Sequence, residues 1–124
     1  MSGEEKKVLI VDDAMFMRRK LRQMLEPCGV EIVGEAGDGE EAIRLTRELQ
    51  PDIVTLDITM PNLDGITCIK DLKAARENLI VIMISALGQK EKVMECLRQG
   101  AVDFIIKPFE PDRVKQVIGR FTNM

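Results

Sequence analysis

Three carboxylates, one hydroxyl and one ammonium group stand at the ends of apolar runs in this chain of 124 residues. Asp12 and Asp13 follow one run, Asp57 follows another, and Ser85 and Lys107 follow two more. Carboxylates a few ångströms apart raise one another's pKa unless a cation lies among them. Oxygen ligands with room for water suit Mg²⁺, and Lys107 adds a fixed positive charge. Together these groups could accommodate a phosphoryl group beside a carboxylate.

Each of these residues also has an ordinary structural explanation. Asp13 stands before a helical stretch that it could cap, and Asp57 precedes a possible turn. Ser85 could cap the segment after it, and a single Lys is by default a solvated surface charge. Taken together, these explanations do not say why all the groups fall at the carboxyl ends of strands. We therefore interpret them as one site.

Five β-branched, apolar runs predict the strands that position these groups. Their apolar character is nearly continuous, which is typical of strands buried on both faces. The predicted strands are Val8–Val11, Glu31–Glu35, Ile53–Leu56, Ile80–Ile84 and Phe104–Ile106. Helical periodicity predicts helices at Ala14–Glu26, Gly39–Leu49, Gly65–Ala75, Glu91–Gln99 and Pro111–Phe121.

The alternation of strand and helix predicts an α/β fold with a parallel sheet covered on both faces. In such a sheet the ligand site lies beyond the carboxyl ends of the strands, where the strand order reverses. Gly34, Gly37 and Gly39 do not follow the first strand, as a dinucleotide-binding loop requires, so we interpret them as turn glycines. We expect a single domain over residues 1–124, with no room for an output domain after the last helix.

Composition and charge exclude several classes of function. The 18 Lys and Arg against 21 Asp and Glu give a net charge of −3, which argues against non-specific nucleic-acid binding. No segment approaches the ~20 apolar residues of a membrane span, and the N-terminus carries no signal-peptide run. Cys28, Cys68 and Cys96 are odd in number and His is absent, so a zinc site and a disulfide framework fit poorly. We expect a cytoplasmic monomer that binds neither nucleic acid nor membrane.

The segments that carry these residues resemble the receiver domains of two-component signalling. The resemblance runs from about Lys7 to Phe121, and its motifs occur in the expected order and spacing. They are Val8-Leu-Ile-Val-Asp-Asp13, Asp57-Ile-Thr-Met-Pro61 with Asp64-Gly65, Ser85-Ala86 and Lys107-Pro108-Phe109. The segment Ser85-Ala-Leu-Gly88 and the lack of an output domain are most similar to the CheY-type chemotaxis regulators. The resemblance implies a flavodoxin-like, doubly wound sheet of five parallel strands in the order 2-1-3-4-5, with five helices.

The resemblance implies that Asp57 is the nucleophile and phosphoacceptor. It also implies that Asp13 and Asp57 bind Mg²⁺ directly, together with the backbone carbonyl of Thr59, while Asp12 acts mainly through water. Lys107 would pair with the phosphoryl oxygens. These roles agree with phosphoryl transfer, which requires positioning and charge neutralisation more than acid–base chemistry.

The resemblance further implies a switch. The Ser85 hydroxyl would bond a phosphoryl oxygen and move toward it, and Phe104 would turn inward into the vacated space. The family often carries Tyr at the position of Phe104, and the alternative is that Phe104 is plain core. The changed face, from the fourth helix to the fifth, would bind the partner. The Lys107–Pro108 peptide bond is expected to be cis.

By the same resemblance, the protein is a signalling switch that catalyses its own phosphorylation and dephosphorylation, and not an enzyme. Its implied partners are a CheA-like histidine kinase, the flagellar motor switch protein and a separate phosphatase. The alternative within the family is a stand-alone phosphorelay intermediate that passes the phosphoryl group to a histidine phosphotransfer domain. A haloacid-dehalogenase-type phosphatase would have a second Asp in place of Thr59. A flavin-binding module would want Trp or Tyr, and both are absent.

Two further features concern regulation. Thr59 and Leu87 flank the expected path of the attacking water, and neither provides the amide or charge often found there, which predicts slow self-dephosphorylation. Met15, Phe16 and Met17 open the first helix, and helical geometry cannot bury all three on one face. At least one is expected at the rim of the site, where a phosphohistidine domain approaches. The alternatives are tolerated surface variants in the first case and adaptable core packing in the second.

Overall fold

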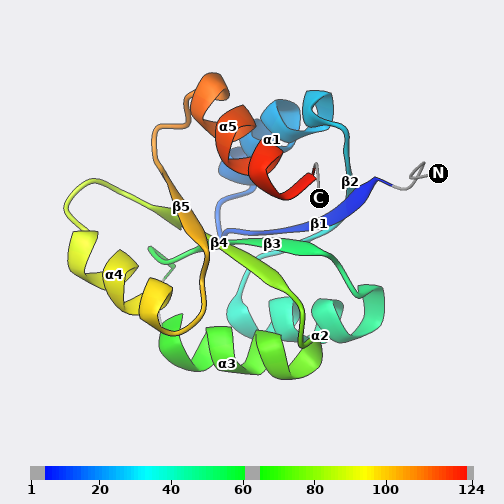
Figure 1. Ribbon diagram of the computed structural model, residues 1–124, viewed down its shortest axis with the longest axis vertical. Helices are drawn as coiled ribbons and strands as arrows, with labels where there is room; N and C mark the ends of the chain where they lie inside the picture. The colour runs from blue at the N-terminus through cyan, green and yellow to red at the C-terminus, as the bar shows by residue number, and fades with distance from the viewer. Residues whose placement is uncertain (1–4, 61–64, 123–124) are drawn as a thin grey trace.

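The structure is a computed structural model that describes residues 5–60 and 65–122 (Figure 1). Pro61 and Asp64 of the predicted motif lie outside the described residues. The strands are β1 (Lys6–Val11), β2 (Val30–Ala36), β3 (Ile53–Asp57), β4 (Ile80–Ser85) and β5 (Asp103–Ile106). The helices are α1 (Met15–Leu25), α2 (Gly39–Leu49), α3 (Gly65–Ala75), α4 (Lys90–Arg98) and α5 (Pro111–Thr122), with a short 3-10 helix η1 (Glu26–Cys28) after α1.

The strands form one sheet in the order β2-β1-β3-β4-β5, and every neighbouring pair is parallel. This confirms the predicted strand order. The register aligns Val11 with Leu56, and Asp57 with Ile84, so the carboxyl ends of the central strands meet at one edge. The strand order reverses at β1 and β3, which therefore form the switch point at which parallel sheets bind ligands.

Helices α1 and α5 cover one face of the sheet, and α2, α3 and α4 cover the other (Figure 1). Alternate residues of β1 divide between the two faces. Val8 and Ile10 pack in the core beneath α1 and α5, whereas Leu9 and Val11 pack in the core of the opposite face. All four are essentially inaccessible to solvent. Full burial of such side chains contributes about 1.5–3 kcal/mol each, which explains the nearly continuous apolar runs.

The predicted elements are all present, and α2 and α3 have the predicted bounds. Helix α1 ends earlier than predicted, because Pro27 lies in the first turn of η1. Gly100, which follows α4 closely, has a φ of 120°, in the left-handed region that favours glycine. The interpretation of Gly34 as a turn residue is wrong. Gly34 lies within β2 at a register shift, where an added Cβ would stand 3.0 Å from Cδ1 of Leu49.

Among the described residues, no helix is long and apolar enough to cross a membrane.

Candidate functional site

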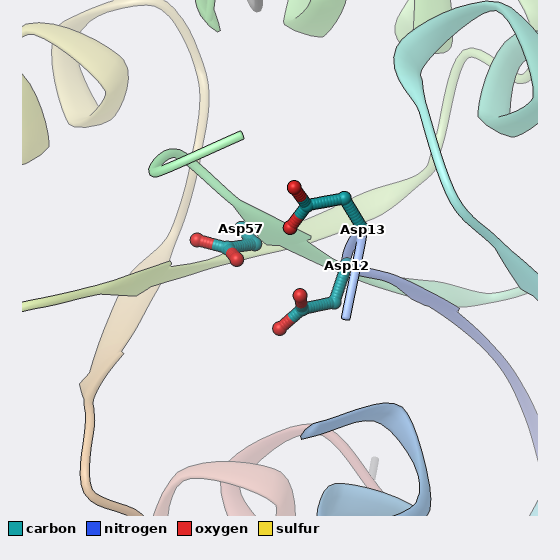
Figure 2. A group of neighbouring side chains, drawn as sticks. All are labelled: Asp12, Asp13 and Asp57. Carbon is teal, nitrogen blue, oxygen red and sulfur yellow. The ribbon is translucent and has the colours of Figure 1, made fainter. Parts of the chain in front are cut away.

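The ends of β1 and β3 bring three carboxylates together. Asp12 and Asp13 follow β1 and Asp57 ends β3, and one carboxylate oxygen of each lies within 4.8 Å of the others. Figure 2 shows the three carboxyl groups extending into the same space. Asp12 and Asp57 are buried, whereas Asp13 is exposed. The sheet therefore places two of the acids at the floor of the site and one at its mouth.

Lys107, directly after β5, reaches across the sheet edge to two of these acids. Its Nζ lies 2.8 Å from Oδ2 of Asp57 and 2.9 Å from Oδ2 of Asp12. Burial alone would lower the pKa of Lys107, but the hydrogen bonds to Asp57 and Asp12 outweigh burial and raise it. The peptide bond between Lys107 and Pro108 is cis, as expected. Lys107 therefore remains charged and bridges the buried carboxylates.

Both oxygens of Asp57 carry hydrogen bonds. Oδ1 accepts from the backbone N–H of Thr59 at 2.8 Å and from the Thr59 hydroxyl at 2.6 Å, and Oδ2 accepts from Lys107. Burial alone would raise the pKa of Asp57, but the donors Lys107 and Thr59 outweigh it and lower the pKa. A carboxylate has about four lone-pair positions, and three are taken here. The ionised Asp57 thus keeps room for one further electrophile or ligand.

The pKa of Asp12 is shifted in the opposite direction from that of Asp57. Its Oδ1 accepts from the backbone N–H of Ala14 at 2.9 Å, and its Oδ2 pairs with Lys107. Burial raises the pKa of Asp12 more than Ala14 and Lys107 lower it, and the charge of Asp57 raises it further. One ammonium group does not compensate three carboxylates, and this excess of negative charge favours a cation.

The donor set suits Mg²⁺. Asp12, Asp13 and Asp57 supply hard oxygen ligands, and the exposure of Asp13 leaves access for the water molecules that Mg²⁺ usually retains. Asp13 is not a helix cap, because the N-cap of α1 is Ala14 and no side chain caps that end. Asp13 also forms no hydrogen bond or ion pair with another described residue. Its carboxylate is therefore available as a metal ligand, whereas the carbonyl of Thr59 remains a ligand by resemblance only.

The remaining predicted residues lie on β4, the β4–α4 loop, β5 and α1. Ser85 ends β4, is buried, and accepts a 2.7 Å hydrogen bond from the N–H of Lys107 through its carbonyl. Phe104 is half-buried in β5 and packs against the core beneath α2, α3 and α4. Leu87 lies in the β4–α4 loop and is 79% exposed. At the start of α1, Met15 and Phe16 are exposed and Met17 packs into the core, which confirms that the three do not share one buried face.

Three neighbours of the site did not stand out in the sequence. Arg18 donates to the backbone carbonyl of Asp12 at 2.6 Å, and the Gln89 side chain accepts from the N–H of Ala86 at 2.7 Å. Arg113 lies over the Phe104 ring, 5.6 Å from its centroid. No local pattern reveals these contacts, because each joins side chains to backbone or rings brought together by the fold.

Residues 8–119 match the family described as the response regulator receiver domain. The chain belongs to this family. It is 48% identical to chemotaxis protein CheY of Thermotoga maritima over 115 residues, which cover 93% of this chain and 96% of the relative. It is 45% identical to CheY of Bacillus subtilis over 117 residues, covering 94% and 98% of the two chains.

Solved structures of receivers have the same fold. A chain in the crystal structure of the CheX–CheY–BeF3–Mg²⁺ complex from Borrelia burgdorferi is 45% identical and superposes with a TM-score of 0.87, with 97% of this receiver and 92% of that chain covered. The response regulator domain of Thermotoga maritima CheB is 37% identical, with a TM-score of 0.80 and coverage of 97% and 95%. The family and the flavodoxin-like fold predicted from the sequence are confirmed.

Proposed function

We propose that this receiver is a phosphorylation switch of a chemotaxis system, in which Asp57 accepts a phosphoryl group from a CheA-like histidine kinase. The observation that supports it most directly is the Lys107 bridge. A buried, ionised Asp57 is held beside a fixed ammonium group at the open edge of the sheet. The identity of 45–48% to CheY proteins over almost the whole chain supports the chemotaxis assignment.

The transfer step is a displacement at phosphorus. One oxygen of Asp57 forms a bond to phosphorus while the bond from phosphorus to the donor histidine nitrogen breaks, and that nitrogen keeps the electron pair. Lys107 neutralises charge on the phosphoryl oxygens, and the Ser85 hydroxyl donates to one of them. Because Asp57 is already ionised, no base is needed to activate it.

Magnesium fits this site for the reasons given above. Asp13 and Asp57 would hold it directly with the carbonyl of Thr59, and Asp12 would act through water. When bound, Mg²⁺ supplies positive charge that screens the acidic cluster from the incoming phosphoryl group. The lowered pKa of Asp57 keeps it ionised and thus ready to bind the metal.

A groove beside Phe104 supports the proposal that the α4–β5–α5 face binds the target. The groove has a volume of about 440 Å³ and combines apolar side chains with charged ones at its rim. It is lined by Leu87, Phe104, Ile106, Lys107, Pro108, Glu110 and Arg113. Lys107 thus belongs to both the site and the groove, and Phe104 lines the groove, so an inward turn of Phe104 would change its shape. The proposed target is the flagellar motor switch protein.

Acceptance of phosphate by Asp57 is tested with a small-molecule phosphodonor and Mg²⁺. Intact mass should show one added phosphoryl group on the wild type and none on Asp57→Asn, which keeps the shape but removes the nucleophile. Asp71→Asn, at an exposed position on α3, is the matched control and should label fully. Undiminished labelling of Asp57→Asn would refute the assignment.

The target is tested by pull-down with and without a stable phosphoryl mimic at Asp57. Recovery of the flagellar motor switch protein only in the presence of the mimic supports the chemotaxis proposal. Recovery of a histidine phosphotransfer domain instead would favour the phosphorelay alternative. The proposal further includes a separate phosphatase, a monomeric state and a cytoplasmic location.

A further inference from the structure

The position of Asp13 depends on its backbone. Its carboxylate is exposed and forms no hydrogen bond or ion pair with the described residues, unlike those of Asp12 and Asp57. Instead, hydrogen bonds to other residues hold the two peptide units that flank Asp13. The unit after it is held through Ala14, whose N–H donates to Oδ1 of Asp12 at 2.9 Å. The unit before it contains the Asp12 carbonyl.

That carbonyl accepts a 2.6 Å hydrogen bond from Nη1 of Arg18, one turn into α1. The N–H of Asp12 is held on the other side by the carbonyl of Ala36 at the end of β2, at 3.0 Å. The Arg18 side chain is mostly buried, with 16% of its surface exposed, and therefore has little freedom to leave. Arg18 thus ties the loop after β1 to the first turns of α1.

The Arg18 guanidinium is itself oriented. Its Nε donates to Oε1 of Glu35 at 2.9 Å, while Arg22 donates to Oε2 of the same carboxylate at 2.9 Å. Burial alone would raise the pKa of Glu35, but Arg22 and Arg18 outweigh it and lower the pKa. Glu35 is therefore charged and fixes the fork of Arg18 in the geometry that reaches Asp12.

We propose that Arg18, oriented by Glu35, is a positioning residue that sets the place of Asp13 as a metal ligand. This inference rests on the proposed function, because it takes Mg²⁺ as the ion bound. Mg²⁺ demands near-ideal octahedral geometry, so a small displacement of one protein ligand weakens binding. Groups that orient metal ligands typically change metal affinity by about 10–100-fold when removed.

Two double variants test the role at constant net charge. Arg18→Met with Glu35→Gln removes the bond to the Asp12 carbonyl. Arg22→Met with Glu35→Gln removes the same charges but leaves Arg18 in place. The Mg²⁺ dissociation constant of each is measured by isothermal titration calorimetry. We expect the first pair to bind about 10-fold more weakly than the wild type. The second pair should bind nearly as the wild type does, because the amide oxygen that Glu35→Gln leaves can still accept from Nε of Arg18.

Equal affinities of the two double variants would overturn the positioning role and leave the proposed function intact. A wild-type protein that binds no Mg²⁺ would overturn both. If circular dichroism shows that the first pair does not fold, the Mg²⁺ affinity of Arg18→Lys is measured instead, with Arg22→Lys as its control. Arg18→Lys keeps the charge but cannot serve Glu35 and Asp12 with one fork, so it should weaken Mg²⁺ binding several-fold. Wild-type affinity in Arg18→Lys would contradict the proposal.

Discussion

The hydroxyl of Thr59 donates a 2.6 Å hydrogen bond to Oδ1 of Asp57, the same oxygen that accepts the Thr59 backbone N–H. Thr59, two residues after Asp57, thus holds the acceptor carboxylate with both its backbone and its side chain. This contact, together with Lys107, keeps Asp57 ionised although it is buried. It also means that one donor must give way when Asp57 binds both a metal and phosphorus, because three of its lone-pair positions are occupied.

Replacement of Thr59 by Val should raise the pKa of Asp57 and destabilise the protein at neutral pH. The change keeps the β-branched shape but removes a donor to a charged acceptor, which costs about 1.5–3 kcal/mol. The pKa of Asp57 is lowered in the folded protein, so its contribution to stability is present above the ordinary value of 3.8 and lost as the pH falls through the folded pKa. The difference in unfolding free energy between wild type and variant should therefore narrow in acid.

Carboxyl-carbon NMR titration measures the pKa, and denaturant unfolding at several pH values measures the stability. Thr46→Val, on α2, provides a control for the same chemical change at a hydroxyl that has no hydrogen-bond partner in the described part of the chain. A titration of Asp57 that is the same in Thr59→Val and in the wild type would show that the hydroxyl does not stabilise the ionised form.

Mg²⁺ should raise the melting temperature of the wild type, because a ligand that binds only the folded state stabilises it by mass action. At a concentration about 100 times the dissociation constant the gain is ~2.7 kcal/mol. Asp13→Ala should lose both this response and phosphoryl labelling. It should not lose a helix cap, since the cap of α1 is Ala14. Thermal unfolding with EDTA and with Mg²⁺ measures the effect.

Asp38→Ala serves as the comparison, because it should lose a helix cap but keep the Mg²⁺ response. Asp38 caps α2 through a 2.8 Å bond from the N–H of Glu41, so its loss should lower the melting temperature by a similar amount with and without Mg²⁺. Wild-type Mg²⁺ affinity in Asp13→Ala would rule out Asp13 as a ligand.

The sequence was sufficient for the parts of the site that follow from strand position. Asp57 and Lys107 come from different strands, yet parallel pairing brings strand ends to one edge, so their proximity could be predicted. The contacts of Arg18 and of the Thr59 hydroxyl could not, because they depend on side-chain conformations and on packing between elements. The prediction that Gly34 is a turn residue was wrong for a related reason. Its lack of a side chain serves the packing of α2 on β2, which a local turn pattern cannot distinguish.

Phe16 is expected to contribute to docking of the phosphohistidine domain. It is 70% exposed at the start of α1, two residues after the loop that carries the acids, and it follows Met15, which is 56% exposed. Phe16→Glu should slow transfer from the kinase several-fold but leave labelling by a small phosphodonor unchanged. Rapid-quench measurements with both donors separate the two effects.

Val102→Glu adds the same charge at an apolar position that is 45% exposed at the opposite, amino end of β5. It should alter neither rate. Equal slowing of both donors by Phe16→Glu would indicate a damaged site and would contradict a docking role.

The lifetime of the phosphorylated form should be long, because the side chains that flank the expected water path offer neither an amide nor a charge to orient a water. The Thr59 hydroxyl is already bonded to Asp57, and Leu87 is an apolar side chain, 79% exposed, in the β4–α4 loop. Polar groups at such positions would orient a water in line with phosphorus, as positioning residues do in other phosphoryl-transfer sites. Thr59→Asn combined with Leu87→Glu introduces an amide and a charge there.

Decay of the purified phosphoprotein should be several-fold faster in this double variant than in the wild type, which requires a barrier lower by only about 1 kcal/mol. The phosphoryl content is followed by intact mass after removal of the donor, in the presence of excess Mg²⁺. Met94→Glu, at an exposed position on α4, controls for the added charge and should decay as the wild type does. The double variant also loses the Thr59 hydroxyl, so Thr59→Val is measured beside it to separate that loss from the new polar groups. Unchanged or slower decay in the double variant would contradict the prediction, because it would show that these two positions do not limit hydrolysis.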